Sequence, residues 1–245
     1  MAFRTDPRVA TSTARVAVEQ IDQGLRSYLL SVYNYMGLGL AVTAIVAMVV
    51  AATPALYVPI FTTPLKWVVM LAPLGFIFFL GAKIQSMSLG AAQATFWAFA
   101  AVMGLSMASI FLVFTGESIA RTFFITAATF GAVSLWGYTT KQDLSKFGTF
   151  LFMGLIGLII ASLVNIFLGS SALQFAISVI GVLVFTGLTA YDTQRLKEEY
   201  LTMASGYGAD GSVVGRSAIM GALSLYLNFI NLFTMLLQFF GQSRE

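Results

Sequence analysis

Asp192 is the side chain in this sequence with the clearest capacity for chemistry, because its carboxylate directly follows the uncharged stretch 147–191. Ionisable groups at membrane depth are expensive to bury and commonly mark ion or proton pathways. Arg195 stands three residues later, within reach on the same helical face. The spacing leaves two interpretations open: a carboxylate that faces the protein interior, or an interfacial acid that pairs with Arg195.

Asn228 and Asn231 form the second notable constellation, because they lie three residues apart in the otherwise mostly apolar run 222–233. This spacing places both amides on one face of a helix. Facing lipid, each amide would lack a hydrogen-bond partner, so we expect this face to point into the protein. Interhelical hydrogen bonds that fix packing are the more frequent role of such amides, and a functional site is the alternative.

The absence of cysteine and histidine from the sequence excludes many kinds of site. There is no disulfide, no thiolate nucleophile, no Cys/His zinc site and no histidine-based catalytic pair, so we do not expect an enzyme. Proton chemistry would depend on the ten acidic residues. A metal site would consist of oxygen ligands alone, which suits Ca²⁺ or Mg²⁺. The net charge of +3 is spread over short segments, so nucleic-acid binding is not expected either.

The elements that must position these residues are membrane-spanning helices. The chain of 245 residues is 58% hydrophobic and only 9% charged, whereas soluble domains carry about 25% charged residues. This composition predicts an all-α integral membrane protein embedded in the lipid bilayer. Seven apolar segments are long enough to span it: 28–52, 64–84, 89–114, 120–139, two within 147–191 that are separated at 169–171, and one within 217–243.

The connections between these segments complete the predicted topology. Pro59 and Pro64 are expected to keep the loop after the first segment non-helical. Residues 192–216 are expected to form the most polar connection. We predict a tail at 1–27 followed by one seven-helix domain at 28–245. Within the tail, 9–25 fits either an amphipathic surface helix or a frayed polar segment.

The distribution of basic residues predicts the orientation in a cell inner (plasma) membrane. Basic residues of cytoplasmic segments usually outnumber those outside. Three basic residues fall on one side, and ten fall on the side of the N-terminus, which is therefore predicted to be cytoplasmic: Arg4, Arg8, Arg15, Arg26, Lys83, Lys141, Lys146, Arg195, Lys197 and Arg216. A re-entrant last segment would give eleven against two, so this rule does not decide whether that segment spans.

Three segments of the sequence resemble motifs of the Bax inhibitor-1 family, also called the transmembrane Bax inhibitor motif family, in its bacterial branch. Lys-Gln-Asp-Leu-Ser at 141–145 is similar to the family's connection before the fifth helix. Tyr-Asp-Thr-Gln at 191–194 is similar to the signature that ends the sixth helix, and 222–240 is similar to the seventh-helix motif. The resemblance implies a central seventh helix wrapped by the other six.

The resemblance also implies a pH-sensitive passive Ca²⁺ leak across the membrane, without a resident cofactor. In this family two aspartates on the last two helices share a proton and can latch a basic residue near the end of the second helix. Asp192 matches the first aspartate and would hold Ca²⁺ weakly, and Lys83 is nearest to the basic position. The remaining residues that would support the site lie within these motifs or directly after one of them: Tyr191, Arg195, Tyr226 and Asn231.

Asn228 stands where the family has its second aspartate, and this departure bears on the mechanism. An amide does not titrate, although it can donate a hydrogen bond to an ionised carboxylate and offer one neutral oxygen to Ca²⁺. We therefore expect a weaker pH switch than in a two-aspartate protein. The alternative is a non-conducting regulator that binds other membrane proteins, since some bacterial members are associated with a membrane-bound AAA protease. Gln93, Asn165 and Gln174 are expected to be isolated packing or interface residues.

Overall fold

The computed structural model describes the backbone of residues 7–205 and 210–244, and the side chains of these residues from residue 20 onward. Apart from one isolated bridge between Phe114 and Ser243, the described residues form helices and turns, which confirms the all-α class. The elements are α1 (Pro7–Ala52), α2 (Pro54–Thr62), α3 (Leu65–Lys83), the 3₁₀ turn η1 (Ile84–Ser86), α4 (Leu89–Val113), α5 (Gly116–Thr139), α6 (Ser145–Leu168), α7 (Ser171–Ser205) and α8 (Gly211–Phe240).

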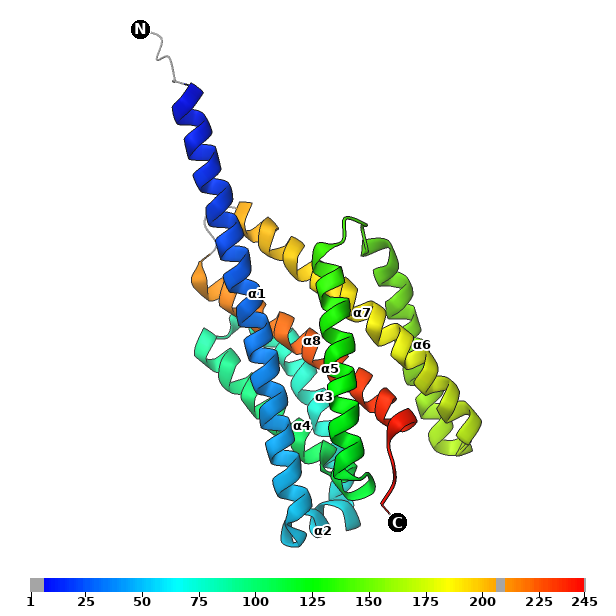
Figure 1. Ribbon diagram of the computed structural model, residues 1–245. Helices are drawn as coiled ribbons and strands as arrows, with labels where there is room; N and C mark the ends of the chain where they lie inside the picture. Colours follow the sequence, from blue (N-terminus) through cyan, green and yellow to red (C-terminus); the bar gives the residue numbers. More distant parts are fainter. Residues whose placement is uncertain (1–6, 206–209, 245) are drawn as a thin grey trace.

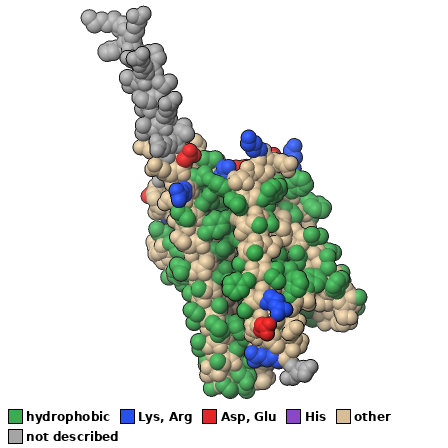
Figure 2. Space-filling view, viewed as in Figure 1, with side chains coloured by type: hydrophobic (Ala, Val, Ile, Leu, Met, Phe, Trp, Pro, Cys, Tyr) green, Lys and Arg blue, Asp and Glu red, His purple; other side chains and the backbone are tan. Residues whose placement is uncertain are grey.

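In the described part of the chain, seven helices are long and apolar enough to cross a membrane, as the sequence predicts. They are α1 and the six long helices from α3 to α8. Figure 2 shows charged side chains at the two ends of the visible face and hydrophobic side chains over the region between them. Large apolar side chains such as Phe78, Phe124 and Phe167 are exposed. In a bilayer this apolar surface faces lipid tails.

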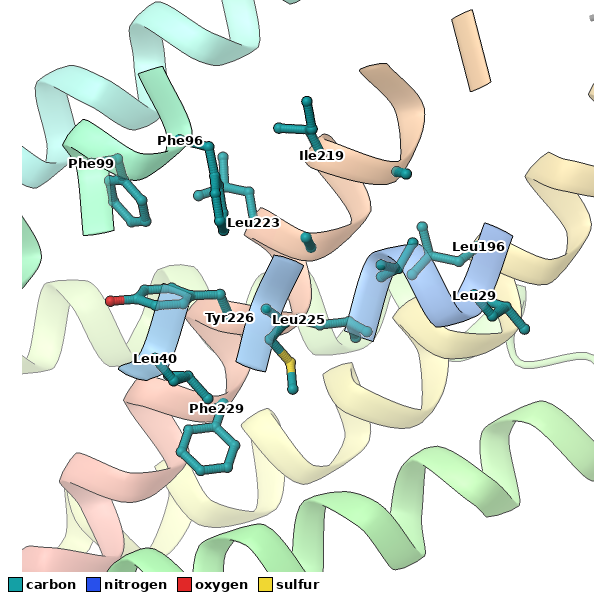
Figure 3. Close-up of a cluster of buried hydrophobic side chains, with 14 of the residues drawn as sticks. Leu29, Leu40, Phe96, Phe99, Leu196, Ile219, Leu223, Leu225, Tyr226 and Phe229 are labelled. Atoms are coloured by element: carbon teal, nitrogen blue, oxygen red, sulfur yellow. The ribbon is translucent and has the colours of Figure 1, made fainter. Parts of the chain in front are cut away.

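The last helix, α8, is the central helix of the bundle. Of its most apolar stretch 67% is buried, against 6% for α6. Helices α1, α4, α5 and α7 all pack against it. The core around α8 includes Tyr226, whose ring lies 5.3 Å from that of Phe99 and 6.4 Å from that of Phe96, both on α4 (Figure 3). The predicted central position of the last helix is confirmed.

An odd number of spans puts the start of the first helix and the end of the last helix at opposite ends of the bundle. The N-terminal part of α1, the start of α6 and the end of α7 lie at one end of the molecule, and the C-terminus and α2 lie at the other (Figure 1). Helix α8 has 30 residues and is therefore about 45 Å long, more than a bilayer core requires. A continuous helix of this length and composition fits the spanning alternative for the last segment.

Several helices extend beyond the predicted limits. Helix α1 runs unbroken from Pro7 across the boundary expected between residues 27 and 28. The connection predicted at 192–216 is wrong, because α7 continues to Ser205 and α8 begins at Gly211. Charges in this segment mark the end of the apolar span, but Arg, Lys and Glu are good helix formers, so the helix continues outside the bilayer.

The non-helical loop predicted around Pro59 is also wrong, because this residue lies inside α2. Pro54 occupies the start of this short helix, where a missing N–H costs nothing. At its end, the hydroxyls of Thr62 and Thr63 donate to the carbonyls of Val58 and Pro59, at 2.6 Å each. Each of these bonds joins a hydroxyl at the end of α2 to a carbonyl four residues earlier.

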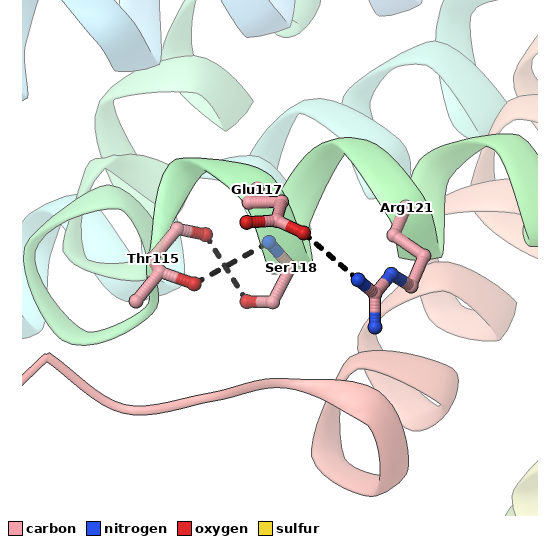
Figure 4. Close-up of polar contacts among 4 residues, drawn as sticks. All are labelled: Thr115, Glu117, Ser118 and Arg121. Atoms are coloured by element: carbon pink, nitrogen blue, oxygen red, sulfur yellow. Dashed lines mark hydrogen bonds and ion pairs between the residues drawn. The ribbon is translucent and has the colours of Figure 1, made fainter.

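Helix α5 begins at Gly116, four residues before the predicted start at Ala120. The Thr115 hydroxyl accepts a hydrogen bond from the Ser118 backbone N–H at 3.3 Å (Figure 4). One turn later, Arg121 forms an exposed ion pair with Glu117 at 2.8 Å. This N-cap and the acidic first turn stabilise the helix start.

The three amides expected to be isolated are hydrogen-bonded to other helices. Asn165 donates to Gln174 at 3.0 Å, and Gln174 donates to Gln238 of α8 at 2.7 Å. Gln93 donates to the Tyr35 hydroxyl at 2.5 Å. Partners far apart in the sequence satisfy these groups, and a pattern along one helix does not reveal such pairs.

Close approach of α5 and α7 generates a prediction about stability. A Cβ on Gly137 would collide with the carbonyl oxygen of Ala190 and lie 2.9 Å from its Cα. Gly137→Ala should therefore destabilise the protein by about 1–3 kcal/mol, measured as the unfolding midpoint in detergent. Gly131→Ala on the same helix is the matched control, since its Cβ would meet nothing within 4 Å. Equal loss of stability in both variants would contradict the close α5–α7 contact.

The orientation inferred from the basic residues remains a prediction that labelling can test. Ser145 and Ser171 are both exposed and start α6 and α7, and the chain has no cysteine. In intact cells, a membrane-impermeant thiol reagent should label Ser171→Cys but not Ser145→Cys. Both should be labelled after permeabilisation, which serves as the control. The reverse pattern would place the N-terminus outside.

Candidate functional site

A pocket of about 480 Å³ surrounds Asp192 between α6, α7 and α8. Polar side chains from all three helices line it, together with apolar ones: Gly148, Thr149, Phe152, Leu155, Leu188, Tyr191, Asp192, Arg195, Ser224, Leu227, Asn228 and Asn231. Gly148 allows α6 to approach α7, because a Cβ there would lie 2.6 Å from the Tyr191 ring. The pocket is therefore a product of close helix packing around one carboxylate.

Asp192 and Asn228 meet inside this pocket, as their places in the two motifs imply. The Asn228 Nδ2 group donates a hydrogen bond to Asp192 Oδ2 at 2.8 Å. Both residues are buried, with 7% and 5% of their surface exposed. An amide that donates to a carboxylate satisfies one buried polar group with the other.

Arg195 holds the second oxygen of the same carboxylate. Its Nη2 lies 3.0 Å from Asp192 Oδ1, and Nη2 also donates to the Ser224 hydroxyl at 3.3 Å. The guanidinium lies 5.8 Å from the centre of the Tyr191 ring, within the range of cation–π attraction. Asp192 thus faces the protein interior and pairs with Arg195 at the same time, so the two interpretations that the sequence left open describe one arrangement.

The other residues singled out in the sequence lie in different places. Asn231 lines the pocket, and its Nδ2 donates to the Leu227 carbonyl of its own helix at 2.8 Å. Tyr226 lies outside the pocket, and its hydroxyl is 2.6 Å from the Thr43 hydroxyl of α1. Lys83 is exposed at the end of α3 and, within the described ranges, makes no ion pair. The structure does not bring Lys83 to Asp192.

Two motif residues without a predicted role anchor the site to neighbouring helices. Gln194 accepts a hydrogen bond from the Leu144 N–H at 2.8 Å and donates to the Gln142 carbonyl at 2.8 Å. The Thr193 hydroxyl lies 2.9 Å from that of Ser134 on α5. The Gln194 contacts fix α7 against the 141–145 connection, and the Thr193 contact joins α7 to α5. In the sequence, these contacts are indicated by two consecutive polar residues after Asp192. The sequence does not reveal the partners of these two residues.

The donor set of the pocket is suited to a hard cation. It contains one carboxylate, the amide oxygens of Asn228 and Asn231, and the hydroxyls of Ser224 and Thr149. Oxygen ligands of this kind are those that Ca²⁺ and Mg²⁺ prefer, and affinity rises with the number of charged ligands. In the part of the chain that the structure describes, no three acidic side chains gather. With a single carboxylate, such a donor set would hold a divalent cation only weakly.

Comparison with known proteins extends the resemblance over nearly the whole chain. The family model described as "Inhibitor of apoptosis-promoting Bax1" matches residues 25–245. The inner membrane protein YbhL of Escherichia coli is 47% identical over 229 residues, which cover 93% of this chain and 97% of the relative. A Caulobacter vibrioides protein is 48% identical, with 92% of each chain covered, and a Rickettsia prowazekii protein is 46% identical, covering 96% of this chain and 98% of the relative. The chain therefore belongs to the Bax inhibitor-1 family.

Proposed function

We propose that this protein is a passive cation leak of the inner membrane, with Ca²⁺ as the favoured ion, and that Asp192 controls it. The observation that carries the proposal is the buried Asp192 carboxylate, in a pocket whose lining also includes amide and hydroxyl side chains. Burial of a carboxylate costs free energy, and attraction of a cation is a function that requires the negative charge of the carboxylate. The name of the relative YbhL supports the choice of membrane.

The position of Asp192 along α7 supports a role at one mouth of the pathway. Helix α7 begins at Ser171, so Asp192 follows about 20 residues of helix, the length that spans a bilayer core. With the predicted orientation, this places the carboxylate near the cytoplasmic surface. An ion that arrives there meets a negative charge in a low-dielectric pocket, where attraction is stronger than in water.

Conduction through this site requires its present contacts to open. Asn228 and Arg195 engage both oxygens of Asp192. We therefore interpret the structure as a closed state, in which the carboxylate is held by its own protein. Opening would free one or both oxygens to replace part of the hydration shell of a passing cation.

Removal of the Asp192 charge tests this function directly. Asp192→Asn should abolish Ca²⁺ entry into liposomes that contain the purified protein, measured with an encapsulated calcium dye. Asp143→Asn, which removes an exposed carboxylate outside the pocket, is the matched control and should leave the flux unchanged.

Two results would contradict a leak at Asp192. Flux at the wild-type level in Asp192→Asn would show that the ion pathway does not depend on this carboxylate. No flux from folded wild-type protein would favour the alternative, a non-conducting regulator that binds another membrane protein such as a membrane-bound protease.

Restoration of a second acid beside Asp192 should produce a stronger pH dependence. Two carboxylates in contact do not both ionise freely, so Asn228→Asp should bind a shared proton as the pH falls. At higher pH both charges attract the cation, so flux should rise with pH more steeply than in the wild type between about pH 5 and about pH 8.

The liposome assay across this pH range provides the measurement, and Gln238→Glu provides the control. Gln238 also lies on α8, but it is outside the Asp192 pocket and accepts a hydrogen bond from Gln174 at 2.7 Å. Identical pH profiles for Asn228→Asp and the wild type would contradict the pairing of residues 192 and 228 at the gate.

A further inference from the structure

Both carboxylate oxygens of Asp192, where a cation would bind, already contact other side chains of the protein. Asp192 Oδ2 accepts from Asn228, and Oδ1 lies 3.0 Å from Arg195 Nη2. Among the described residues that line the pocket, Asp192 is the one acid and Arg195 the one base. A metal ion that bound this carboxylate would have to displace the guanidinium or share the oxygen with it.

Arg195 is placed so that it can leave this position. Its side chain is 45% exposed, whereas that of Asp192 is 10% exposed, so the guanidinium reaches into the pocket from the surface. The Tyr191 ring and the Ser224 hydroxyl provide further contacts on the same side. If Arg195 releases Asp192, its guanidinium can still contact the Tyr191 ring and the Ser224 hydroxyl, and it can bind water. The guanidinium is therefore not left unpaired.

We propose that Arg195 is a tethered cation that competes with the transported cation for Asp192, and thereby sets the affinity and the rate of the leak. This inference rests on the proposed function of the same site. It assigns the competing charge to a residue one turn along α7, instead of to Lys83 on α3. Since Arg195 is part of the same helix as Asp192, its local concentration is high, and only a divalent or concentrated cation competes well.

Neutralisation of Arg195 tests the competition without any need for conduction. Arg195→Gln should bind Ca²⁺ about tenfold more tightly than the wild type, because an ion pair of intermediate exposure no longer opposes binding. Isothermal titration with Ca²⁺ in detergent measures this change. Lys197→Gln is the matched control: this lysine is on the same helix but bonds to the Tyr138 carbonyl at 3.1 Å, away from the pocket. Unchanged affinity in Arg195→Gln, or equal gains in both variants, would overturn the proposal.

A removable charge at position 195 separates the electrostatic role from a structural one. The chain has no cysteine, so Arg195→Cys presents a single thiol. Flux through Arg195→Cys should exceed that of the wild type. A cationic aminoethyl methanethiosulfonate should lower it again, a neutral reagent of similar size should not, and a reductant should reverse the effect. Equal effects of both reagents, or no effect of either, would overturn the proposal.

These outcomes are distinguishable from failure of the proposed function. If Asp192→Asn keeps wild-type flux, the leak at Asp192 is wrong whatever Arg195 does. If Asp192→Asn abolishes flux but position 195 does not respond to charge, only the tethered-cation inference is wrong. Should Arg195→Cys not fold, Arg195→Lys retains the positive charge and should keep Ca²⁺ affinity closer to that of the wild type than Arg195→Gln does.

Discussion

The bilayer provides no hydrogen-bond partners, and this constraint governs the whole molecule. A polar side chain on a membrane helix must find its partner on another helix or on its own backbone. Helix α8 carries Asn228, Asn231 and Gln238, and it occupies the centre of the bundle, where other helices surround it. The pairing of Asn228 with Asp192 is one case of this rule, and the contact of Gln238 with Gln174 at the other end of α7 is another.

Close helix contact is the condition that allows these pairs to form. Glycines at the interfaces let neighbouring helices approach to distances that any larger residue would prevent. A Cβ on Gly148 would meet Tyr191, and one on Gly221 would lie 2.5 Å from the Leu196 side chain. Gly148 on α6 lines the Asp192 pocket, and Gly221 on α8 lies one turn before Ser224, which also lines it. The geometry of the carboxylate is thus set by residues that have no functional groups of their own, in keeping with small residues at membrane helix interfaces.

The sequence predicted the features that arise from hydrophobicity and from motifs. Seven spans follow from composition, and the meeting of Asp192 with Asn228 follows from their positions in two motifs. The limits of α1 and α7 were missed because charge marks where the bilayer ends and does not stop a helix. The contacts of Asn165, Gln93 and Gln194 were missed because each depends on a partner that only the packed structure brings near. The exposed position of Lys83, away from Asp192, likewise depends on how α3 is placed, which no pattern along the chain specifies.

The central claim is that the Asp192 carboxylate itself binds the cation that the protein passes. Infrared difference spectroscopy of the protein in lipid nanodiscs, with and without Ca²⁺, reports directly on carboxylate groups. We predict that Ca²⁺ shifts a carboxylate stretching band of the wild-type protein and that this band is absent from the difference spectrum of Asp192→Asn. The same Ca²⁺-dependent band in Asp192→Asn, or no band in the wild type, would contradict the assignment of Asp192 as the cation site.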